Sequence, residues 1–334
     1  MFTKTTYDNL ARPTRSYTGY ELSGGGGGDV VVADQDTAYN KIGQVLSTTT
    51  KLRDTDTPAG APTFRETHAA MYYDGLGRSI ASADYGTNGG SAFTRLSAIP
   101  ARSDDVLVST TAYNDAGEAE TFTDPQGTAS KTEYDDMGRT RKQIDNYQAS
   151  GSGPDINRTT ETTYTADSLQ ETVTAKMTDP ADDEVTTYIY GVTTSGGSGL
   201  NANNLLTAVQ YPTDTASQRI NLKVNRQGET IERGDQNGTV HEYCYDLLGR
   251  PITDAVTSFG TGIDDTVKRL TTTYTSRGQV ATLTSHSAAS GTGDEVNQVE
   301  MAYNDFGQLV TDYQEPAGTV DTATSLKVQY GYPL

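Results

Sequence analysis

The sequence has 334 residues, a net charge of -19, 21 tyrosines, no tryptophan and one cysteine, Cys244. A surface this acidic argues against binding nucleic acid or an anionic membrane. No stretch approaches the roughly 18 apolar residues that a membrane-spanning helix needs, so we expect no membrane insertion. Few aliphatic residues and a high net charge are typical of disordered chains, but tyrosine and threonine favour strands.

A six-residue phrase, Tyr-(Asp/Asn)-x-x-Gly-(Arg/Gln/Glu), returns along the chain. A recurring period of roughly 20–40 residues marks a repeat architecture, in which the repeated residues build scaffold rather than an active site. In chain order, with degenerate copies at the first, sixth, seventh and ninth places, the phrase occupies Tyr7–Arg12, Tyr39–Gln44, Tyr73–Arg78, Tyr113–Glu118, Tyr134–Arg139, Tyr164–Leu169, Val224–Glu229, Tyr245–Arg250, Tyr274–Gln279 and Tyr303–Gln308.

Each phrase has the chemistry of a tight hairpin turn. Asp or Asn in the first turn position can bind the backbone two residues on, and Gly in the fourth position accepts a positive φ. We therefore expect a type I turn that closes with a left-handed residue and a bulge, with Tyr ending one strand and Arg opening the next. The residues assigned to this role are Tyr39, Gly43, Tyr73, Asp74, Gly77, Arg78, Tyr113, Gly117, Tyr134, Asp135, Gly138, Arg139, Tyr245, Asp246, Gly249, Arg250, Tyr303 and Gly307.

A second type of turn is expected at the opposite ends of the strands, where one hairpin connects to the next. It occurs at Asp124–Thr128, Asp235–Thr239 and Glu315–Thr319. Alternating turns at opposite ends produce an antiparallel meander, and a long meander must curl or coil. The assignment has a test at the residue level. Gly138→Val should destabilise the chain more than Gly89→Val, because only Gly138 is expected to need a positive φ.

Polar inserts rich in Gly and Ser interrupt the spacing of the repeated phrase and are expected to be surface loops. None separates segments of different composition, so residues 1–334 are interpreted as one repeat array, expected to be a fragment of a longer protein. The segment Asn201–Tyr211 is compatible with a helix or with an irregular strand. The inserts are Ser23–Asp29, Gly86–Ala92, Ala149–Pro154, Ser195–Gly199 and Ala288–Asp294.

The copies beginning at Tyr73, Tyr134 and Tyr245, with the companion Asp-Pro-Gln-Gly-Thr at Asp124, resemble the YD-repeat, or RHS-repeat, family over nearly the whole chain. The resemblance implies an all-β fold, a repetitive antiparallel β-hairpin ribbon wound into a curved sheet or open shell. In bacterial members such a shell commonly encloses a toxic C-terminal polypeptide, and in animal teneurins a similar shell serves cell adhesion. The family's terminal core motif with its proteolytic aspartates is absent from this sequence, so self-cleavage is not carried over.

The other reactive residues favour no enzyme. His68, His241 and His286 share no ligand spacing, and Cys244 and His241, three positions apart on a strand, would face opposite sides. Clustered acids are compatible with a glycosidase pair or weak calcium binding, but none forms an EF-hand loop, and solvated loop acids are favoured. They are Asp34/Asp36, Asp54/Asp56, Asp104/Asp105, Asp182/Asp183/Glu184, Asp264/Asp265 and Asp294/Glu295.

Three functions follow as hypotheses. The first is a non-enzymatic shell segment of a secreted or cell-surface protein, with the rest of that protein or an enclosed C-terminal polypeptide as its partner. The second is an adhesion module that binds carbohydrate or a cell surface, and the third is a polysaccharide hydrolase. We expect no cofactor and no catalytic residue, with weak calcium binding as an alternative.

Overall fold

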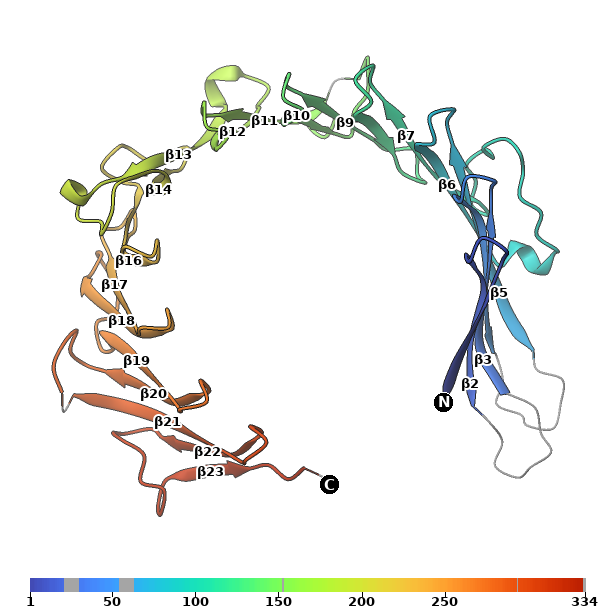
Figure 1. Cartoon of the computed structure of the whole chain (residues 1–334). Helices are drawn as coiled ribbons and strands as arrows, with labels where there is room; N and C mark the ends of the chain where they lie inside the picture. The colour runs from blue at the N-terminus through green and yellow to red at the C-terminus, as the bar shows by residue number, and fades with distance from the viewer. Residues whose placement is uncertain (21–29, 54–62, 152, 293, 333–334) are drawn as a thin grey trace. The chain divides into compact units, whose positions relative to one another are not determined.

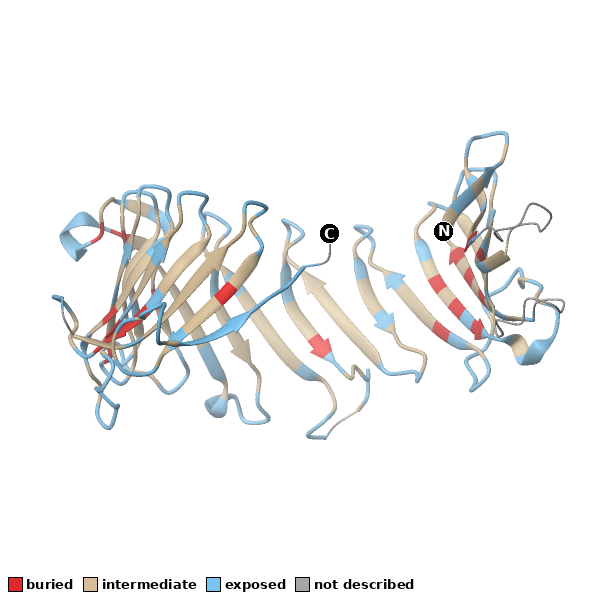
Figure 2. Ribbon diagram, turned by 90° about the horizontal axis from the view of Figure 1, so that it is seen from below, coloured by how far each residue is buried: buried red, intermediate tan, exposed pale blue. Residues whose placement is uncertain are grey.

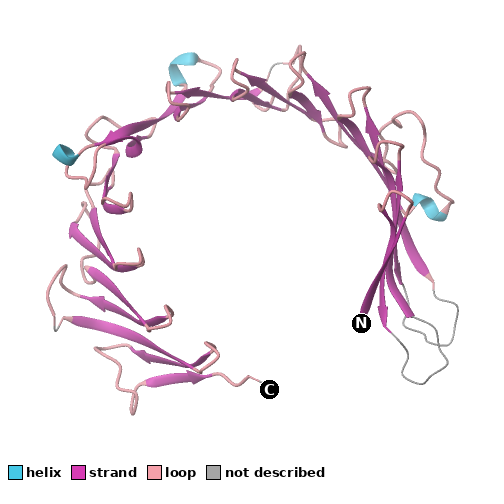
Figure 3. Ribbon diagram, in the orientation of Figure 1, coloured by secondary structure: helices cyan, strands magenta, loops and turns pink. Residues whose placement is uncertain are grey.

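The computed structural model describes residues 1–20, 30–53, 63–151, 153–292 and 294–332. This part of the chain holds 23 strands and three short 3-10 helices (Figure 3), which confirms the all-β expectation. The helices are η1 (Asn88–Gly90), η2 (Pro180–Asp182) and η3 (Thr194–Gly196). Among the described residues, no helix is long and apolar enough to cross a membrane.

The chain divides into two compact units, Met1–Thr160 and Glu161–Leu334. The first contains ten complete strands, which Figure 1 labels in part. They are β1 (Phe2–Tyr7), β2 (Pro13–Tyr20), β3 (Val30–Tyr39), β4 (Val45–Arg53), β5 (Phe64–Tyr73), β6 (Ser79–Gly86), β7 (Leu107–Tyr113), β8 (Ala119–Thr123), β9 (Ala129–Tyr134) and β10 (Thr140–Asp145).

The strand β11 (Arg158–Tyr164) spans the division, and the second unit contains the remaining strands. They are β12 (Gln170–Ala175), β13 (Glu184–Val192), β14 (Ala202–Gln210), β15 (Ile220–Val224), β16 (Thr230–Gly234), β17 (Val240–Tyr245), β18 (Pro251–Ser258), β19 (Arg269–Tyr274), β20 (Val280–His286), β21 (Glu295–Tyr303), β22 (Leu309–Glu315) and β23 (Leu326–Gln329).

Both units are antiparallel meanders. From β1 to β10, and again from β12 to β23, each described strand pairs with the next one along the chain. These pairings close no ring within either unit, so each sheet is open. The repetitive hairpin sheet is confirmed, while the winding of the whole chain and its identity as one array stay predictions.

The turn geometry predicted from the phrase is present. Gly77, Gly138 and Gly249 have φ values of 82°, 75° and 77°. In the turn that begins at Asp74, the backbone N–H of Leu76 donates to the carboxylate at 2.9 Å, and the register of β5 and β6 shifts by one residue at its end. The turn therefore has the left-handed residue and the bulge that the phrase requires.

Three expectations need correction or completion. Gly89 also has a positive φ, 59°, because the insert folds back through hydrogen bonds such as Gly90 N to Thr87 O at 2.9 Å. Glu315 does not open a tight turn: its longer side chain accepts from Ala317 N and Ser325 Oγ, and a ten-residue loop, 316–325, leads to β23. The segment of β14, left open above, is a strand paired on both sides.

A single sheet layer has little core, and few of the described residues are fully buried (Figure 2). The exception in the first unit lies on β5 to β7, where Ala70, Tyr72, Ala83 and Val108 are buried beneath Phe93. Arg95 holds this covering segment, since its guanidinium donates to the Met71 carbonyl at 2.7 Å and lies over the Tyr72 ring. Burial, with a hydrogen bond to Tyr85, raises the pKa of Tyr72 to about 12.

The insert Ser23–Asp29, and with it Gly24–Gly28, lies outside the described residues, as do Asp54 and Asp56. The other inserts lie largely between strands, as expected; one of them contains η1 and another overlaps η3.

Candidate functional site

The tyrosine of the phrase ties each hairpin to the one before it. Tyr73 Oη donates to the carbonyl of Val45 at 2.9 Å, and Tyr245 Oη donates to that of Thr230 at 2.7 Å. In both cases the acceptor directly follows the preceding phrase. The same bond links Tyr39 to Pro13, Tyr113 to Ser79, Tyr134 to Ala119, Tyr190 to Gln170, Tyr274 to Pro251, Tyr303 to Val280 and Tyr332 to Leu309.

The last residue of the phrase reaches in the opposite direction, toward the next turn. Gln44 Nε2 donates to the carbonyl of Gly77 at 2.6 Å. In three copies that end in arginine, at Arg12, Arg78 and Arg250, the guanidinium covers the next tyrosine ring, as for Arg78 over Tyr113 at 4.3 Å. Gln279 and Arg250 repeat these two contacts with Gly307 and Tyr274. We call this set of tyrosine and sixth-residue contacts the turn ladder.

The aspartate and arginine of one phrase also pair with each other. Arg78 Nε lies 2.7 Å from Asp74 Oδ2, and Arg250 and Asp246 repeat that distance. The side chain of Arg139, followed by its backbone N–H, holds the pKa of Asp135 below its ordinary value. The predicted residues therefore meet within one turn or between two consecutive turns. The tyrosines, aspartates and arginines have hydrogen-bond or ring partners, and the glycines have a positive φ.

Sequence reasoning missed Tyr190, which joins the turn ladder although the sequence after it lacks the turn residues. The available signal was a tyrosine at the end of an alternating strand. The ladder also bears on the adhesion hypothesis. A tyrosine hydroxyl that donates to a backbone carbonyl cannot donate its hydrogen to a sugar as well, although its oxygen can still accept.

His286 and Cys244 line one pocket, whereas His68 and His241 have other partners. His68 is buried, stacks on Phe93 at 4.7 Å between ring centres and bonds Thr49. His241 bonds Asp254 at 2.7 Å, while Cys244 is exposed. Within the described residues, no group of three His, Cys, Asp or Glu side chains is placed to hold a metal ion.

The described acid clusters are partly engaged in ion pairs. Asp34 is buried and lies 2.6 Å from Arg15. Asp183 pairs with Lys176. These contacts neutralise two of the carboxylates that a calcium site would need.

One acid holds a loop against the sheet. The carboxylate of Asp294 accepts from Ala288 N at 2.8 Å and from Arg269 at 3.1 Å, and it lies 3.3 Å from His286 Nδ1. His286 Nε2 lies 2.9 Å from Thr271 Oγ1. This order of hydroxyl, imidazole and carboxylate resembles a catalytic triad, but His286 is 6% exposed and the carboxylate is shared with Arg269. We interpret the group as a clip for the loop.

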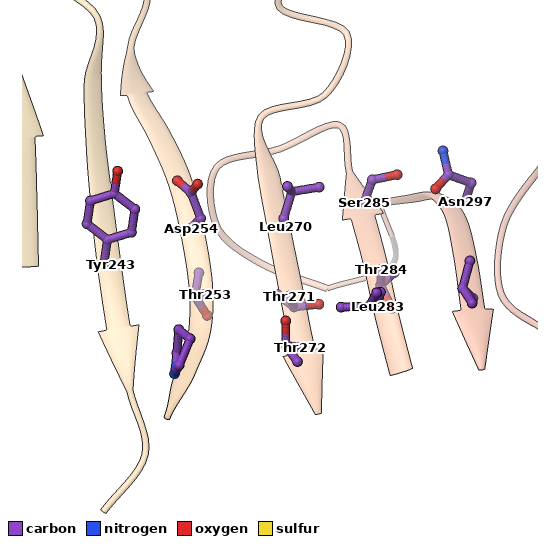
Figure 4. Close-up of a pocket in the computed structure, with 12 residues that line it drawn as sticks. Tyr243, Thr253, Asp254, Leu270, Thr271, Thr272, Leu283, Thr284, Ser285 and Asn297 are labelled. Carbon is purple, nitrogen blue, oxygen red and sulfur yellow. The ribbon is translucent and has the colours of Figure 1, made fainter. Parts of the chain in front are cut away.

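The opposite face of this part of the sheet carries a pocket of about 450 Å³ (Figure 4). We call this side of β18 to β23 the bare face. Cross-strand pairing places on it Asp254, Leu270, Leu283, Ser285, Val299, Asp312 and Val328. The residues lining the pocket are Tyr243, Pro251, Thr253, Asp254, Leu270, Thr271, Thr272, Leu283, Thr284, Ser285, Asn297 and Val299.

The pocket is lined by apolar and polar side chains. Leu270 and Leu283 are 51% and 42% exposed. Asp254, Leu270, Ser285 and Asn297 lie in one row across the strands (Figure 4). Among the described residues, Asp254 is the one carboxylate that lines the pocket. A pocket of this kind suits binding, whereas glycoside hydrolysis generally needs two carboxylates.

No protein-family model matches the sequence, and no curated protein matches it, so the YD-repeat resemblance has no support from a family model. Among solved structures, the chain is similar to TcdB2-TccC3, with 12% identity and a TM-score of 0.34 over 98% of this chain and 20% of that one. It is also similar to the Photorhabdus luminescens Tc holotoxin pore, with 12% identity and a TM-score of 0.27 over 93% and 19%. A porin-like protein from Bacteroides uniformis gives 14% identity and a TM-score of 0.23 over 95% and 93%. The chain spans about a fifth of the length of the first two.

Proposed function

We propose that the chain is a structural, non-enzymatic wall segment of a larger secreted or cell-surface protein of the YD-repeat type. Its role is to enclose or display another polypeptide, of the toxin kind in bacterial proteins of that type. The turn ladder carries this proposal. The recurring tyrosine binds the hairpin before it, and the recurring sixth residue contacts the turn after it.

The ladder gives a single-layer sheet the cohesion that a wall needs. Each hairpin is stabilised by its immediate neighbours, which is how repeat proteins extend without a thick core. The aspartate–arginine pairs and left-handed glycines fix each turn, so the hairpins stack in register. The partners that fit this role are the rest of the parent protein and the polypeptide that the wall encloses.

Solution scattering on the full chain, with and without calcium, tests the wall. We expect a folded particle in both conditions. The triple variant Tyr73→Phe, Tyr113→Phe and Tyr303→Phe should expand, because three ladder bonds are lost together. Tyr20→Phe is the matched control, since Tyr20 lies on a strand outside the ladder. A flexible-coil profile for the wild type would overturn the proposal.

The pocket on the bare face favours the adhesion alternative, because Tyr243, Asp254 and Asn297 line it together with apolar side chains. A glycan array, run with and without calcium, decides between the two. Saturable glycan binding that Tyr243→Ala abolishes would favour the adhesion module over the wall segment. We expect no saturable glycan binding and no turnover of polysaccharides.

A further inference from the structure

We propose that the bare face is a docking site for an extended stretch of polypeptide in which apolar and basic side chains alternate. The inference rests on the proposed function for the identity of that partner, which is the polypeptide held by the wall. The face itself is defined by contacts and register in β18 to β23 and does not depend on that role.

The first observation is a pair of buried polar atoms. Ser285 is 6% exposed, and among the described residues Ser285 Oγ and Asp312 Oδ1 are the buried side-chain oxygens without a hydrogen-bond partner. Ser285 lies opposite Asn297, and Asp312 lies opposite Met301 on the same strand as Asn297. Both oxygens therefore lie on the bare face. Buried polar groups are normally paired, and the N–H donors of a bound segment would satisfy them.

The second observation is exposed apolar surface that continues across the strands. Leu270 and Leu283 line the pocket. Farther along, Leu326 and Val328 on β23 are 71% and 47% exposed, and Val328 lies opposite Asp312. Apolar side chains gathered on one face are typical of an interaction surface. The opposite face, by contrast, carries the loop that Asp294 clips to the sheet.

The third observation is charge. The described strands β18 to β22 place no lysine or arginine on the bare face, since Arg269 lines a separate pocket on the other side. Asp254 and Asp312 are the acids there, and the chain as a whole has a net charge of -19. Because partners bind best where their electrostatic potentials are of opposite sign, the negative bare face favours a basic partner and disfavours an acidic peptide or a second copy of this chain.

The fourth observation is the arrangement in rows. Asp254, Leu270, Ser285 and Asn297 lie in one row across the strands (Figure 4), and Thr272, Leu283 and Val299 form the next, so each row mixes polar and apolar side chains. Successive side chains of an extended segment point in opposite directions. A segment that places its leucines on Leu270 and Leu283 therefore points its alternating lysines away from the sheet, where they lie in the negative potential of the acidic chain.

Fluorescence anisotropy on the full chain tests the site with three labelled peptides of equal length, alternating Leu–Lys, Leu–Glu and Ser–Lys. We expect saturable binding of the Leu–Lys peptide alone. Replacing Leu270 and Leu283 together by serine should weaken it at least tenfold, and Asp312→Asn at least threefold. Leu52→Ser is the matched control, because Leu52 is an equally exposed leucine, 42%, on a strand of the first unit.

Ser285→Ala separates a binding role from a packing defect. Removing an unpaired buried hydroxyl should raise the melting temperature, and the loss of the hydroxyl should weaken the Leu–Lys peptide about threefold, roughly the strength of one neutral hydrogen bond. A raised melting temperature with unchanged binding would remove Ser285 from the site.

Three results would overturn the inference: no saturable binding of the Leu–Lys peptide, equal binding of the Leu–Glu peptide, or a dimer in sedimentation that the double serine variant dissociates. Failure of the wall proposal is read separately, from scattering of the wild type and of the tyrosine variants. The peptide can therefore fail to bind although the scattering supports the wall proposal. Conversely, the peptide can bind although turnover of a polysaccharide contradicts the wall proposal.

Discussion

At the residue scale, the left-handed position of the turn is the strictest requirement of the phrase. Glycine fills it in most copies, but Ala11 and Ser168 occupy it with φ values of 59° and 64°. A side chain with a Cβ atom is strained there. The degenerate copies therefore keep the turn because the flanking strands pair, as β1 does with β2.

Relieving this strain should stabilise the protein. Ala11→Gly is expected to raise the free energy of unfolding by about 0.5–1 kcal/mol, because the left-handed penalty exceeds the extra entropy that glycine loses on folding. Urea unfolding at neutral pH measures the change. Ala38→Gly, on the exposed side of β3, should lower the same quantity by about 0.5–1 kcal/mol. A destabilised Ala11→Gly variant would contradict the strain.

Backbone conformation does not distinguish the cost of valine at Gly138 from its cost at Gly89, since both have a positive φ. A Cβ atom at Gly138 would lie 3.0 Å from Glu118 Oε1, whereas one at Gly89 would meet nothing within 4 Å. Both valine variants should lose roughly 1–3 kcal/mol, with Gly138→Val the less stable of the two. Equal melting temperatures would show that the contact with Glu118 has no cost.

At the element scale, the hairpin is held by contacts to its neighbours on both sides. Arg78 shows this most clearly, because it pairs with Asp74 in its own turn and covers Tyr113 of the next. A double-mutant cycle isolates the second contact from the first.

For Arg78→Gln and Tyr113→Leu we expect a coupling of about 0.5–1 kcal/mol, as for exposed cation–π pairs. The pair Arg78→Gln and Tyr274→Leu provides the control, since those residues belong to different units. Its coupling should be near zero. Equal couplings in both cycles would mean that the effects are transmitted globally and not through the turn ladder.

The turn aspartates predict how stability depends on pH. Hydrogen bonds from the side chain and then the backbone of Arg139 lower the pKa of Asp135, and those from the backbone and then the side chain of Arg250 lower that of Asp246. Because the folded pKa lies below the unfolded value of about 3.9, the stabilisation is complete above that pH and is lost as the pH falls through the folded pKa.

Asparagine already fills this position at Asn40, Asn114 and Asn304, so it is a compatible replacement. The variant Asp135→Asn with Asp246→Asn should show a smaller drop in melting temperature between pH 7 and pH 3 than the wild type. An unchanged drop would mean that other carboxylates cause the acid sensitivity.

At the scale of the whole molecule, stability should be local. Each strand in a unit contacts its sequence neighbours, so damage to one hairpin spreads to the next and fades. Gly138→Val should accelerate amide hydrogen exchange in β9 and β10 and leave β20 to β22 unchanged. Exchange measured by mass spectrometry decides this, and a uniform acceleration along the chain would instead indicate one cooperative body.

The hairpins could be located from the sequence, because their turns depend on local chemistry. Asp or Asn binds the backbone two residues on, and glycine four positions into the turn takes the left-handed conformation, so spacing alone located Gly77, Gly138 and Gly249. The same reasoning failed at Glu315, where contacts to Ser325 in the following loop replaced the local turn.

The contacts between different hairpins, in contrast, could be identified only in the folded chain. The bond from the Tyr73 hydroxyl to the Val45 carbonyl spans 28 residues, whereas the equivalent bond from Tyr134 to Ala119 spans 15, because the segments between the phrases vary in length. The one-residue bulge beside each turn also shifts the alternation of faces. Ser285 and Asp312 could therefore be assigned to one face only from the observed register, since side-chain direction in a sheet reverses with every residue of shift.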